Sequence, residues 1–338
     1  MRTLPADALA AIWPPHGRYA SVTWQVSDVC NYSCSYCNPG NFGARHRNLD
    51  TEAYIRSIDE MLSFFRARGY KNFRFFFSGG EPTVWPPLIP VLEHIRREVP
   101  RALIAINTNL SKPLAWWEKH HTLFNDIVAS FHIEHCDQEN YLRNAEFLQD
   151  RMDYLVYRLL MHDARFPEVV SFAETLKARL DNFQIEYAAL MEALSPHAEM
   201  HVYQEAWKRE FVATHTLDQQ QRLPKRPGVP PSDPSYVAEF MGDLRQESHN
   251  SNRLVSENKN DFRGWKCWIN DALFIGPDGQ VRAASCDMGS IVGNIHQGGF
   301  TFQDGPVVCR QARCNCGTDI GIRKAHPDYA DELERTDG

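Results

Sequence analysis

Three cysteines, Cys30, Cys34 and Cys37, form a CxxxCxxC pattern in a short stretch near the start of the chain. Three thiolates at this spacing can bind three irons of a four-iron, four-sulfur cluster and leave the fourth iron without a protein ligand. Soft sulfur donors select iron–sulfur clusters or zinc over hard cations, but zinc motifs more often pair their cysteines as two CxxC units. The spacing therefore favours a cluster with one open iron, and zinc is the alternative.

A second motif, Ser78-Gly79-Gly80-Glu81-Pro82, follows a predicted buried strand. Paired glycines let a ligand approach the backbone closely, and their exposed amides and carbonyls can bind a zwitterion. Together with CxxxCxxC and the aromatic Tyr36 before its last cysteine, this motif resembles the radical S-adenosylmethionine (SAM) superfamily. The resemblance implies that the open iron chelates the amino and carboxylate groups of SAM. Reductive cleavage then yields a 5′-deoxyadenosyl radical, which removes a hydrogen atom from the substrate.

The resemblance also implies SAM contacts at the ends of predicted strands. The Gly79–Pro82 segment resembles a site for the SAM amino group, and Tyr36 is expected near the adenine. Asn107-Thr108-Asn109 matches a Thr-Asn-Gly turn of the family only in part, because Leu110 replaces the glycine. Ser130, on the fourth predicted strand, is expected to face the SAM ribose or carboxylate. Arg158, on the fifth, carries a guanidinium that suits the geometry of the SAM carboxylate. For both residues, ordinary structural roles are the alternative. The expected cofactor-binding residues are Tyr36, Gly79, Gly80, Glu81, Pro82, Asn107, Asn109, Ser130 and Arg158.

His132-Ile133-Glu134-His135-Cys136 follows the fourth predicted strand and supplies the candidate catalytic residues. Alternation puts His132 and Glu134 on one face, with His135 past the strand. Imidazole and carboxylate together can move a proton from a hydroxyl or carbon acid, and Cys136 can donate a hydrogen atom to a substrate radical. The alternatives are hydrogen bonds to each other and to neighbouring loops, and a buried inert thiol at Cys136.

Five more cysteines lie near the C-terminus, and between the first two Phe274–Val281 predicts a hairpin that turns at Asp278-Gly279. The group resembles the SPASM/twitch extension of radical SAM enzymes, which binds auxiliary iron–sulfur clusters. The full SPASM cysteine set is absent, so one auxiliary 4Fe–4S cluster is expected, and structural zinc is the competing interpretation. The favoured ligands are Cys267, Cys286, Cys314 and Cys316, with Cys309 as the alternative.

The elements that must position these motifs alternate between strand and helix six times from about residue 20 to 190. Such alternation is typical of parallel strands joined by crossovers, with active sites at the C-terminal strand ends. Six repeats are too few for a closed eight-fold barrel. We therefore predict an α/β fold: a partial (β/α)6 TIM-like barrel with a small C-terminal β-hairpin/helix cluster-binding extension. The helix at 114–124 is expected to carry two exposed or half-buried tryptophans.

The predicted domains are the partial barrel (1–190), a linker or insertion that could cover the active site (191–263) and the auxiliary iron–sulfur domain (264–325). The net charge of −7 gives no electrostatic reason to expect nucleic acid, and no apolar run approaches membrane-spanning length. The first 13 residues show no signal-peptide pattern, and nine cysteines point to metal or redox chemistry. We expect a cytoplasmic enzyme with a reducing partner such as flavodoxin or ferredoxin.

The predicted function is that of a radical SAM oxidoreductase or isomerase acting on a small polar metabolite such as a sugar, aminocyclitol or nucleoside. An auxiliary cluster that accepts an electron would give net oxidation, and hydrogen return from Cys136 or Cys309 would give epimerisation. The alternative is a maturase of a ribosomally synthesised peptide. Only about twenty residues precede the first predicted strand, which leaves no room for an N-terminal leader-peptide domain and favours the small molecule. A third possibility, a non-enzymatic metal-binding module, predicts no SAM binding.

Overall fold

The structure is a computed structural model in which two compact units can be distinguished. Unit 1 comprises Met1–Thr23, Glu52–Arg74 and Asp233–Gly338, and unit 2 comprises Trp24–Thr51 and Phe75–Ser232. The predicted domain boundaries after residues 190 and 263 stay predictions. The described residues are 8–14, 19–37, 46, 49–190, 201–215, 217–220, 236–241, 246–249, 254, 259–286, 289–302, 304–314 and 317–329.

Unit 2 is an open α/β sheet, as predicted. Strands β4 (Leu103–Thr108), β5 (Asp126–Phe131), β6 (Tyr154–Met161) and β7 (Phe183–Ala189) are adjacent and parallel, and β8 (Leu217–Gln220) adds an antiparallel edge. The C-terminal residues of β2 (Tyr19–Gln25) and β3 (Asn72–Ser78) precede β4 in the hydrogen-bonded order. This order does not close on itself, so the prediction of a partial barrel is confirmed.

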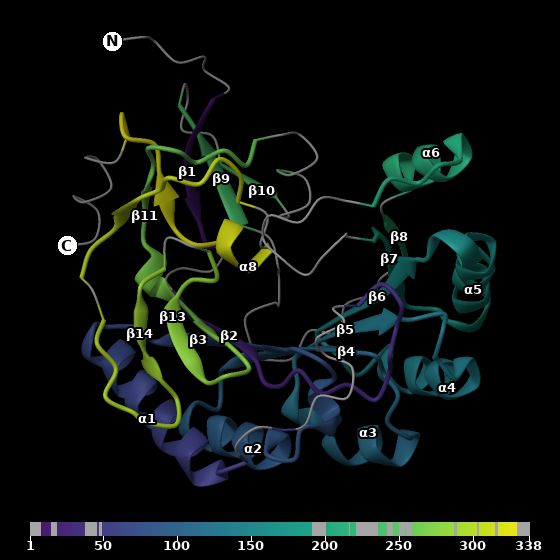
Figure 1. The fold of residues 1–338 in the computed structure, drawn as a ribbon, viewed down its shortest axis with the longest axis horizontal. Helices are drawn as coiled ribbons and strands as arrows, with labels where there is room; N and C mark the ends of the chain where they lie inside the picture. Colours follow the sequence, from purple (N-terminus) through teal and green to yellow (C-terminus); the bar gives the residue numbers. More distant parts are fainter. Residues whose placement is uncertain are drawn as a thin grey trace. The chain divides into compact units, whose positions relative to one another are not determined.

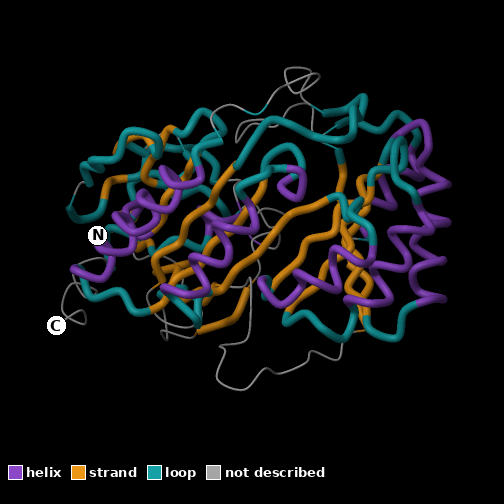
Figure 2. The backbone as a smooth tube through the Cα atoms, turned by 90° about the horizontal axis from the view of Figure 1, so that it is seen from below, coloured by secondary structure: helices purple, strands orange, loops and turns teal. Residues whose placement is uncertain are grey.

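The crossovers of unit 2 are helices that cover one face of the sheet. They are α2 (Leu88–Glu98), α3 (Leu114–His120), α4 (Gln138–Leu148) and α5 (Phe166–Arg179). Figure 1 shows α3, α4 and α5 along the outer side of β4–β7, and Figure 2 shows the same arrangement from below. These helices leave the other face of the sheet uncovered, and the polar side chains described below lie on that face.

Aromatic packing joins these helices to the strands. The Phe131 ring on β5 stacks on Phe172 of α5 at 3.9 Å between centroids, and the Tyr141 hydroxyl of α4 donates to the Ala129 carbonyl at 2.8 Å. Trp117 on α3 is fully buried. The expectation of two exposed or half-buried tryptophans is therefore wrong for Trp117, because this side chain packs edge-on against Trp116 and beside Phe124.

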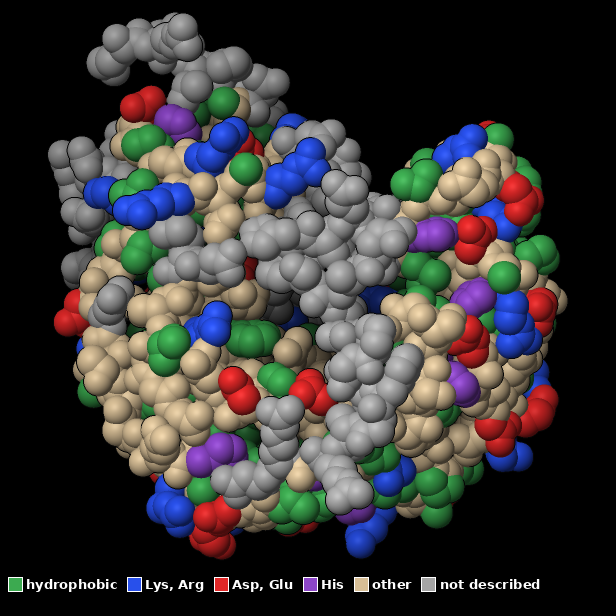
Figure 3. Space-filling view, in the orientation of Figure 1, with side chains coloured by type: hydrophobic (Ala, Val, Ile, Leu, Met, Phe, Trp, Pro, Cys, Tyr) green, Lys and Arg blue, Asp and Glu red, His purple; other side chains and the backbone are tan. Residues whose placement is uncertain are grey.

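The segment after β7 includes a short helix, α6 (Ala206–Thr214). The Lys208 ammonium donates to the side chain and carbonyl of Asp163 at 2.7 and 2.8 Å, just after β6. The buried Tyr203 hydroxyl donates to the Met161 carbonyl at 2.7 Å. These bonds fasten α6 at the C-terminal ends of the strands. On the face of unit 2 seen in Figure 3, Lys, Arg, Asp and Glu are interspersed over the outer helices.

Unit 1 contains a six-stranded sheet and a smaller meander. The six strands follow the order β10-β9-β1-β16-β11-β15, and the meander joins β12, β13 and β14 through antiparallel pairs. The predicted hairpin is confirmed, with Gly279 at φ 80° in its turn. The bounds are β1 (Leu9–Trp13), β9 (Tyr236–Phe240), β10 (Gln246–His249), β11 (Lys266–Cys267), β12 (Ala272–Ile275), β13 (Gln280–Ala283), β14 (Ile291–Asn294), β15 (Val307–Val308) and β16 (Lys324–Ala325).

Helices described in unit 1 include α1 (Thr51–Ala67) and the short α8 (Gly317–Ile320). The Glu60 carboxylate of α1 accepts from the Phe300 N–H at 2.8 Å, and the Ser57 hydroxyl donates to the Ile295 carbonyl at 2.5 Å. These contacts join α1 to the segment that follows β14. Among the described residues, no helix combines the length and apolar character that a membrane span requires.

Candidate cluster and cofactor site

The loop after β2 carries the first three cysteines in unit 2. Cys34 is buried, and Cys30 and Cys37 are half-buried. The Cys37 N–H donates to the Cys34 carbonyl at 3.0 Å, and the Tyr32 N–H donates to the Cys30 sulfur at 3.3 Å, so the loop is tightly turned. Burial raises the pKa of Cys34 to about 12. Three soft donors on one short loop fit an iron–sulfur cluster, whose metal keeps its thiols deprotonated.

The two glycines of the second motif pack against the start of this loop. Gly79 has φ 124°, and a Cβ there would lie 2.5 Å from the Ser27 carbonyl oxygen. A Cβ at Gly80 would lie 2.2 Å from the Val29 carbonyl oxygen. The N–H groups of Gly80 and Glu81 donate to those same two carbonyls, at 2.7 and 2.9 Å. Only glycine allows this approach, so the motif holds the cysteine loop in place.

Glu81 is buried, and both of its carboxylate oxygens are engaged by protein donors. Oε1 accepts from the Thr83 N–H at 3.0 Å and from the hydroxyls of Thr83 and Thr108 at 2.7 Å, and Oε2 accepts from the Asn109 N–H at 2.6 Å. Burial raises the pKa of Glu81, and these hydrogen bonds oppose the rise. The side chain therefore ties the glycine motif to the end of β4, and Pro82 opens the short 3₁₀ turn Pro82–Val84 beside it.

Replacing Glu81 with Ala should destabilise the protein strongly. The substitution leaves four buried donors without an acceptor, and each such group costs about 1–3 kcal/mol. We expect a loss of more than about 3 kcal/mol in the free energy of unfolding, measured by urea denaturation of the metal-free protein. Glu93→Ala on the exposed side of α2 is the matched control and should change stability by less than about 0.5 kcal/mol. Equal stability of the two variants would contradict the assignment.

The turn after β4 reaches the cysteine loop through side-chain amides. Asn109 Nδ2 donates to Asn31 Oδ1 at 2.9 Å, and Asn31 Nδ2 donates to the Ser111 hydroxyl at 2.9 Å. Leu110 has φ 56°, in the left-handed region that favours glycine. The backbone at Leu110 therefore has the left-handed conformation expected for the glycine of a Thr-Asn-Gly turn, even though the residue here is leucine.

A polar strip crosses the open face of the sheet at the C-terminal ends of β4–β7. The Ser130 hydroxyl donates to Asn107 Oδ1 at 2.8 Å, and Arg158 Nε donates to Glu186 Oε2 at 2.6 Å. Ser130, Arg158 and Glu186 are aligned across neighbouring strands. The strip brings three of the expected cofactor-binding residues together. Glu186 was missed, although its alternation on β7 places it on the same face.

His132 lies against the cysteine loop. Strand β5 ends at Phe131, and the N–H groups of His135 and Cys136 both return to the His132 carbonyl, so residues 132–136 form a turn and do not extend the strand. His132 Nδ1 lies 2.9 Å from the Tyr36 hydroxyl and 3.5 Å from the Cys34 sulfur. Burial lowers the pKa of His132 to about 4, which keeps the imidazole neutral near neutral pH.

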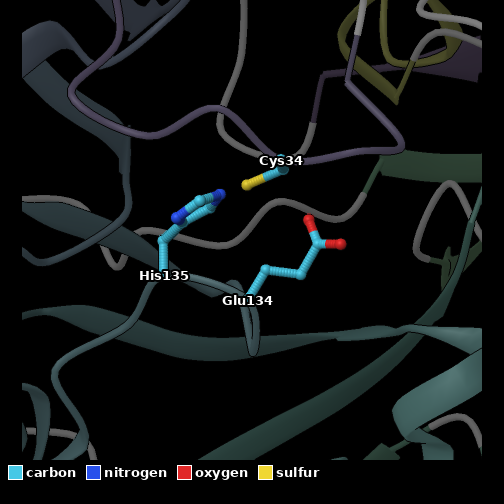
Figure 4. A group of neighbouring side chains, drawn as sticks. All are labelled: Cys34, Glu134 and His135. Atoms are coloured by element: carbon cyan, nitrogen blue, oxygen red, sulfur yellow. The ribbon is translucent and has the colours of Figure 1, made fainter.

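Glu134 and His135 converge on Cys34 from this turn, as Figure 4 shows. One ligand atom of each of the three residues lies within 4.8 Å of the others. The Glu134 carboxylate accepts from the Ser35 N–H at 2.7 Å and from its hydroxyl at 2.6 Å, and His162 Nε2 lies 3.1 Å from Oε1. His162 was not among the residues predicted from the sequence, although it follows β6 directly and active-site residues are expected at the C-terminal ends of the strands.

The contribution of Glu134 to stability should disappear in acid. Partial burial would raise its pKa, but the bonds from Ser35 and the neighbouring His162 outweigh burial and lower it. A carboxylate with a lowered folded pKa stabilises the fold fully above its unfolded pKa of about 4.3, and the contribution is lost as pH falls through the folded pKa. The stability difference between metal-free wild type and Glu134→Gln should therefore shrink in acid unfolding series. A difference that grows toward low pH would contradict this.

Cys136 is half-buried in the same turn, and its thiol interacts with Tyr32. Burial raises the pKa of Cys136 to about 12, with the Asp137 charge adding to the rise and the hydrogen bond with Tyr32 opposing it. The residue is therefore a neutral thiol near neutral pH. A neutral S–H group is the form that can give up a hydrogen atom, whereas a thiolate is a nucleophile.

The C-terminal cysteines lie in unit 1. Cys267 on β11 is buried, which raises the pKa of its thiol to about 12; the Lys324 charge opposes the rise and Cys309 and Cys286 add to it. The Cys309 N–H donates to the Trp265 carbonyl at 2.8 Å. Cys309 and Cys314 pack against one hydrophobic cluster that includes Trp265. Cys286, Cys309 and Cys314 are half-buried, and the first two act electrostatically on the buried Cys267. Such a group of soft donors fits a second cluster, and Cys316 lies outside the described residues.

The profile of the Radical SAM superfamily matches residues 24–185 of the chain. Among curated proteins, a GTP 3′,8-cyclase of Pasteurella multocida is 29% identical over 105 residues, which cover 30% of each chain. A GTP 3′,8-cyclase of Pectobacterium atrosepticum is 25% identical over 181 residues, covering 49% of this chain and 54% of that protein. The chain therefore spans about half the length, or less, of these curated relatives.

Two solved structures resemble the chain weakly. BtrN in complex with AdoMet and 2-DOIA has a TM-score of 0.41 at 13% identity, covering 82% of this chain and 78% of that one. Streptococcus suis SuiB bound to the precursor peptide SuiA has a TM-score of 0.41 at 11% identity, covering 79% and 60%. At this level of similarity, neither structure bears on the substrate of this protein.

Proposed function

Because residues 24–185 of this chain are a radical SAM domain, we propose that Cys30, Cys34 and Cys37 hold its 4Fe–4S cluster and leave one iron for SAM. The observation that carries this assignment is the backbone pairing of Gly80 and Glu81 with Ser27 and Val29, which fixes the start of the cysteine loop. When bound, the cluster would supply the single electron for reductive cleavage of the SAM C5′–S bond, which gives methionine and a 5′-deoxyadenosyl radical able to take a hydrogen atom from the substrate.

The residues around the loop are proposed to position SAM and substrate. Tyr36 would pack beside the adenine, and the backbone of Gly79 and Gly80 would bind the amino group. On the polar strip, the Ser130 hydroxyl would meet the ribose or carboxylate, and the Arg158 guanidinium would pair with the carboxylate. Glu186 holds Arg158 Nε at 2.6 Å and so fixes the orientation of the guanidinium.

A small polar metabolite is the proposed substrate, with nucleotides first among the candidates. The polar strip offers hydroxyl, amide, guanidinium and carboxylate groups on the open face of the sheet, and the curated relatives are named for a reaction of GTP. His132 and Glu134 would hold or move a proton at a substrate hydroxyl. An external protein such as flavodoxin or ferredoxin would supply the electron.

A substrate screen tests this proposal. The reconstituted and reduced protein is given SAM and, one at a time, GTP, other nucleosides, sugars and aminocyclitols, while 5′-deoxyadenosine is quantified. We expect one small molecule to raise 5′-deoxyadenosine formation above the level with SAM alone and to be converted in equal amount. Conversion of peptides with no response to any small molecule would contradict the proposed substrate class.

Cys136→Ala distinguishes epimerisation of the substrate from its net oxidation. For epimerisation, a neutral Cys136 thiol would return a hydrogen atom to the substrate radical, and the resulting thiyl radical would be restored to the thiol by one electron from the external reductant and a proton from solvent. Product made in deuterated water should then carry one deuterium at the altered carbon. Cys136→Ala should then abolish turnover and retain SAM cleavage. For net oxidation, the substrate radical loses an electron, which we propose the auxiliary cluster accepts, and a proton. Unchanged turnover of Cys136→Ala without deuterium in the product would exclude the thiol as donor.

A further inference from the structure

Lys324 on β16 carries a positive charge in the interior of unit 1. The residue is 1% exposed. Its ammonium donates to the carbonyl oxygens of Asp319, Ile320 and Ile322, at 2.7, 2.8 and 3.0 Å. An ammonium has three N–H donors, so each one has a carbonyl partner. These acceptors are neutral, and the positive charge is therefore hydrogen-bonded but not neutralised by them.

Cysteines of the auxiliary group lie beside this charge. Strands β11 and β16 are antiparallel neighbours, and Cys267 is the register partner of Lys324. On its other side, β11 pairs with β15, which leads directly into Cys309. Cys267 is 7% exposed, so solvent screens little of the interaction between its sulfur and the Lys324 charge.

A second buried charge of opposite sign faces the same region. Asp319 is 4% exposed, and its carboxylate accepts from the N–H of Ser285 at 3.1 Å and from the hydroxyl of Ser285 at 2.6 Å. Ser285 precedes Cys286, another candidate ligand. The Lys324 and Asp319 charges interact with each other, and an anionic cluster would give Lys324 a second negative partner.

We propose that Lys324 is a positioning residue that offsets the thiolate charge of the auxiliary cluster and raises its reduction potential, with Asp319 moderating that effect. The inference rests on the proposed auxiliary cluster. Net charge and hydrogen bonding around a cluster set its reduction potential, and residues behind the ligands tune a metal site. Adding an electron makes the cluster more negative, so a fixed positive charge in a poorly screened interior favours the reduced form.

A purely structural role for Lys324 makes a different prediction. If the ammonium only caps the last carbonyls of α8, replacing it should lower the stability of unit 1 and leave the potential unchanged. Lys324→Gln keeps an N–H donor but removes the charge, and Lys324→Arg keeps the charge. Lys266 supplies a matched control, because it precedes Cys267 on β11 and alternation directs its side chain to the opposite face.

The test is an EPR-monitored redox titration of the full chain carrying Cys30→Ala, Cys34→Ala and Cys37→Ala, so that the auxiliary cluster alone gives the signal. We expect Lys324→Gln to disfavour reduction about tenfold, which is 59 mV for a one-electron couple. Lys324→Arg and Lys266→Gln should stay close to the parent. Asp319→Asn should shift the potential in the opposite direction. This variant leaves the Lys324 hydrogen bonds in place, so it can be measured even if Lys324→Gln does not fold.

Two results would overturn the inference, and they are distinguishable. Potentials of Lys324→Gln and Asp319→Asn that equal that of Lys266→Gln would show that the buried charges do not act on the cluster; if only Asp319→Asn folds, its unchanged potential has the same meaning. A parent protein that binds zinc, or no iron, at the C-terminal cysteines would remove the auxiliary cluster itself and the inference with it. In that second case the radical SAM assignment of residues 24–185 would be unaffected.

Discussion

Gly80→Ala should empty the cysteine loop of its cluster and abolish SAM cleavage. An added Cβ would lie 2.2 Å from the Val29 carbonyl oxygen, 2.5 Å from its carbonyl carbon and 2.9 Å from the carbonyl carbon of Asp28. All three atoms belong to the backbone just before Cys30, so no side chain can move aside to make room. The loop must shift, and the hydrogen bond from Gly80 N–H to Ser27, 2.7 Å long, must break.

The readout is the iron content of anaerobically reconstituted protein together with 5′-deoxyadenosine formation. We expect Gly80→Ala to keep about half of the iron, that of the auxiliary cluster. Gly69→Ala is the control: Gly69 also has a positive φ, of 80°, but a Cβ there would meet nothing within 4 Å. This control should lose about 1–2 kcal/mol of stability from the left-handed backbone and retain its iron. Full iron and normal cleavage in Gly80→Ala would contradict the role of the close contact.

Replacing Cys30, Cys34 and Cys37 together with Ala should remove one cluster and leave the other. If each cluster holds four irons, the wild type should contain about eight and the variant about four. SAM cleavage should be lost entirely in the variant, because no open iron remains. Iron and sulfide analysis after reconstitution gives the stoichiometry directly.

Cys136→Ala is the control for the loss of a thiol in the same region. This cysteine is half-buried beside Tyr32, outside the CxxxCxxC loop. The variant should retain the full iron complement and the ability to cleave SAM. A triple variant that keeps all of its iron would refute the assignment of the first three cysteines as ligands.

The sequence allowed the α/β core and the cysteine loop to be predicted because both depend on local patterns. Strands β4–β7 and the helices between them have apolar residues at regular spacing, and the structure confirms them. The family resemblance, now supported by the profile match to residues 24–185, drew attention to Gly79 and Gly80. It did not show that these glycines touch Ser27 and Val29, since that contact joins segments about fifty residues apart.

Other elements could not be predicted because long-range pairing decides them. Strand β1 has the sequence Leu-Ala-Ala-Ile-Trp, without alternation and with two alanines that favour helix over strand. Its strand conformation comes from pairing with β9 and β16, more than 200 residues later. Strands β11, β15 and β16 each have only two residues, too few for a periodic pattern.

The polar partners of the site were missed for the same reason. Glu186 on β7 and His162 after β6 belong to no sequence motif, and only the fold brings them to Arg158 and Glu134. From the sequence, Lys324 would be expected on the surface, because lysine is rarely buried. Only the fold shows that its ammonium is enclosed by three carbonyls. The positions of Cys30, Cys34 and Cys37, in contrast, were evident from spacing alone.

The most direct test of an open iron is electron–nuclear double resonance on the reduced protein with SAM labelled by ¹⁵N in its amino group and ¹⁷O in its carboxylate. The protein should carry the C-terminal cysteines as Ala, so that only the cluster of Cys30, Cys34 and Cys37 contributes. We predict hyperfine coupling of both labels to the cluster, as expected when SAM chelates one iron. A reduced cluster that shows no coupling to either label in saturating SAM, or zinc at these cysteines, would contradict the account.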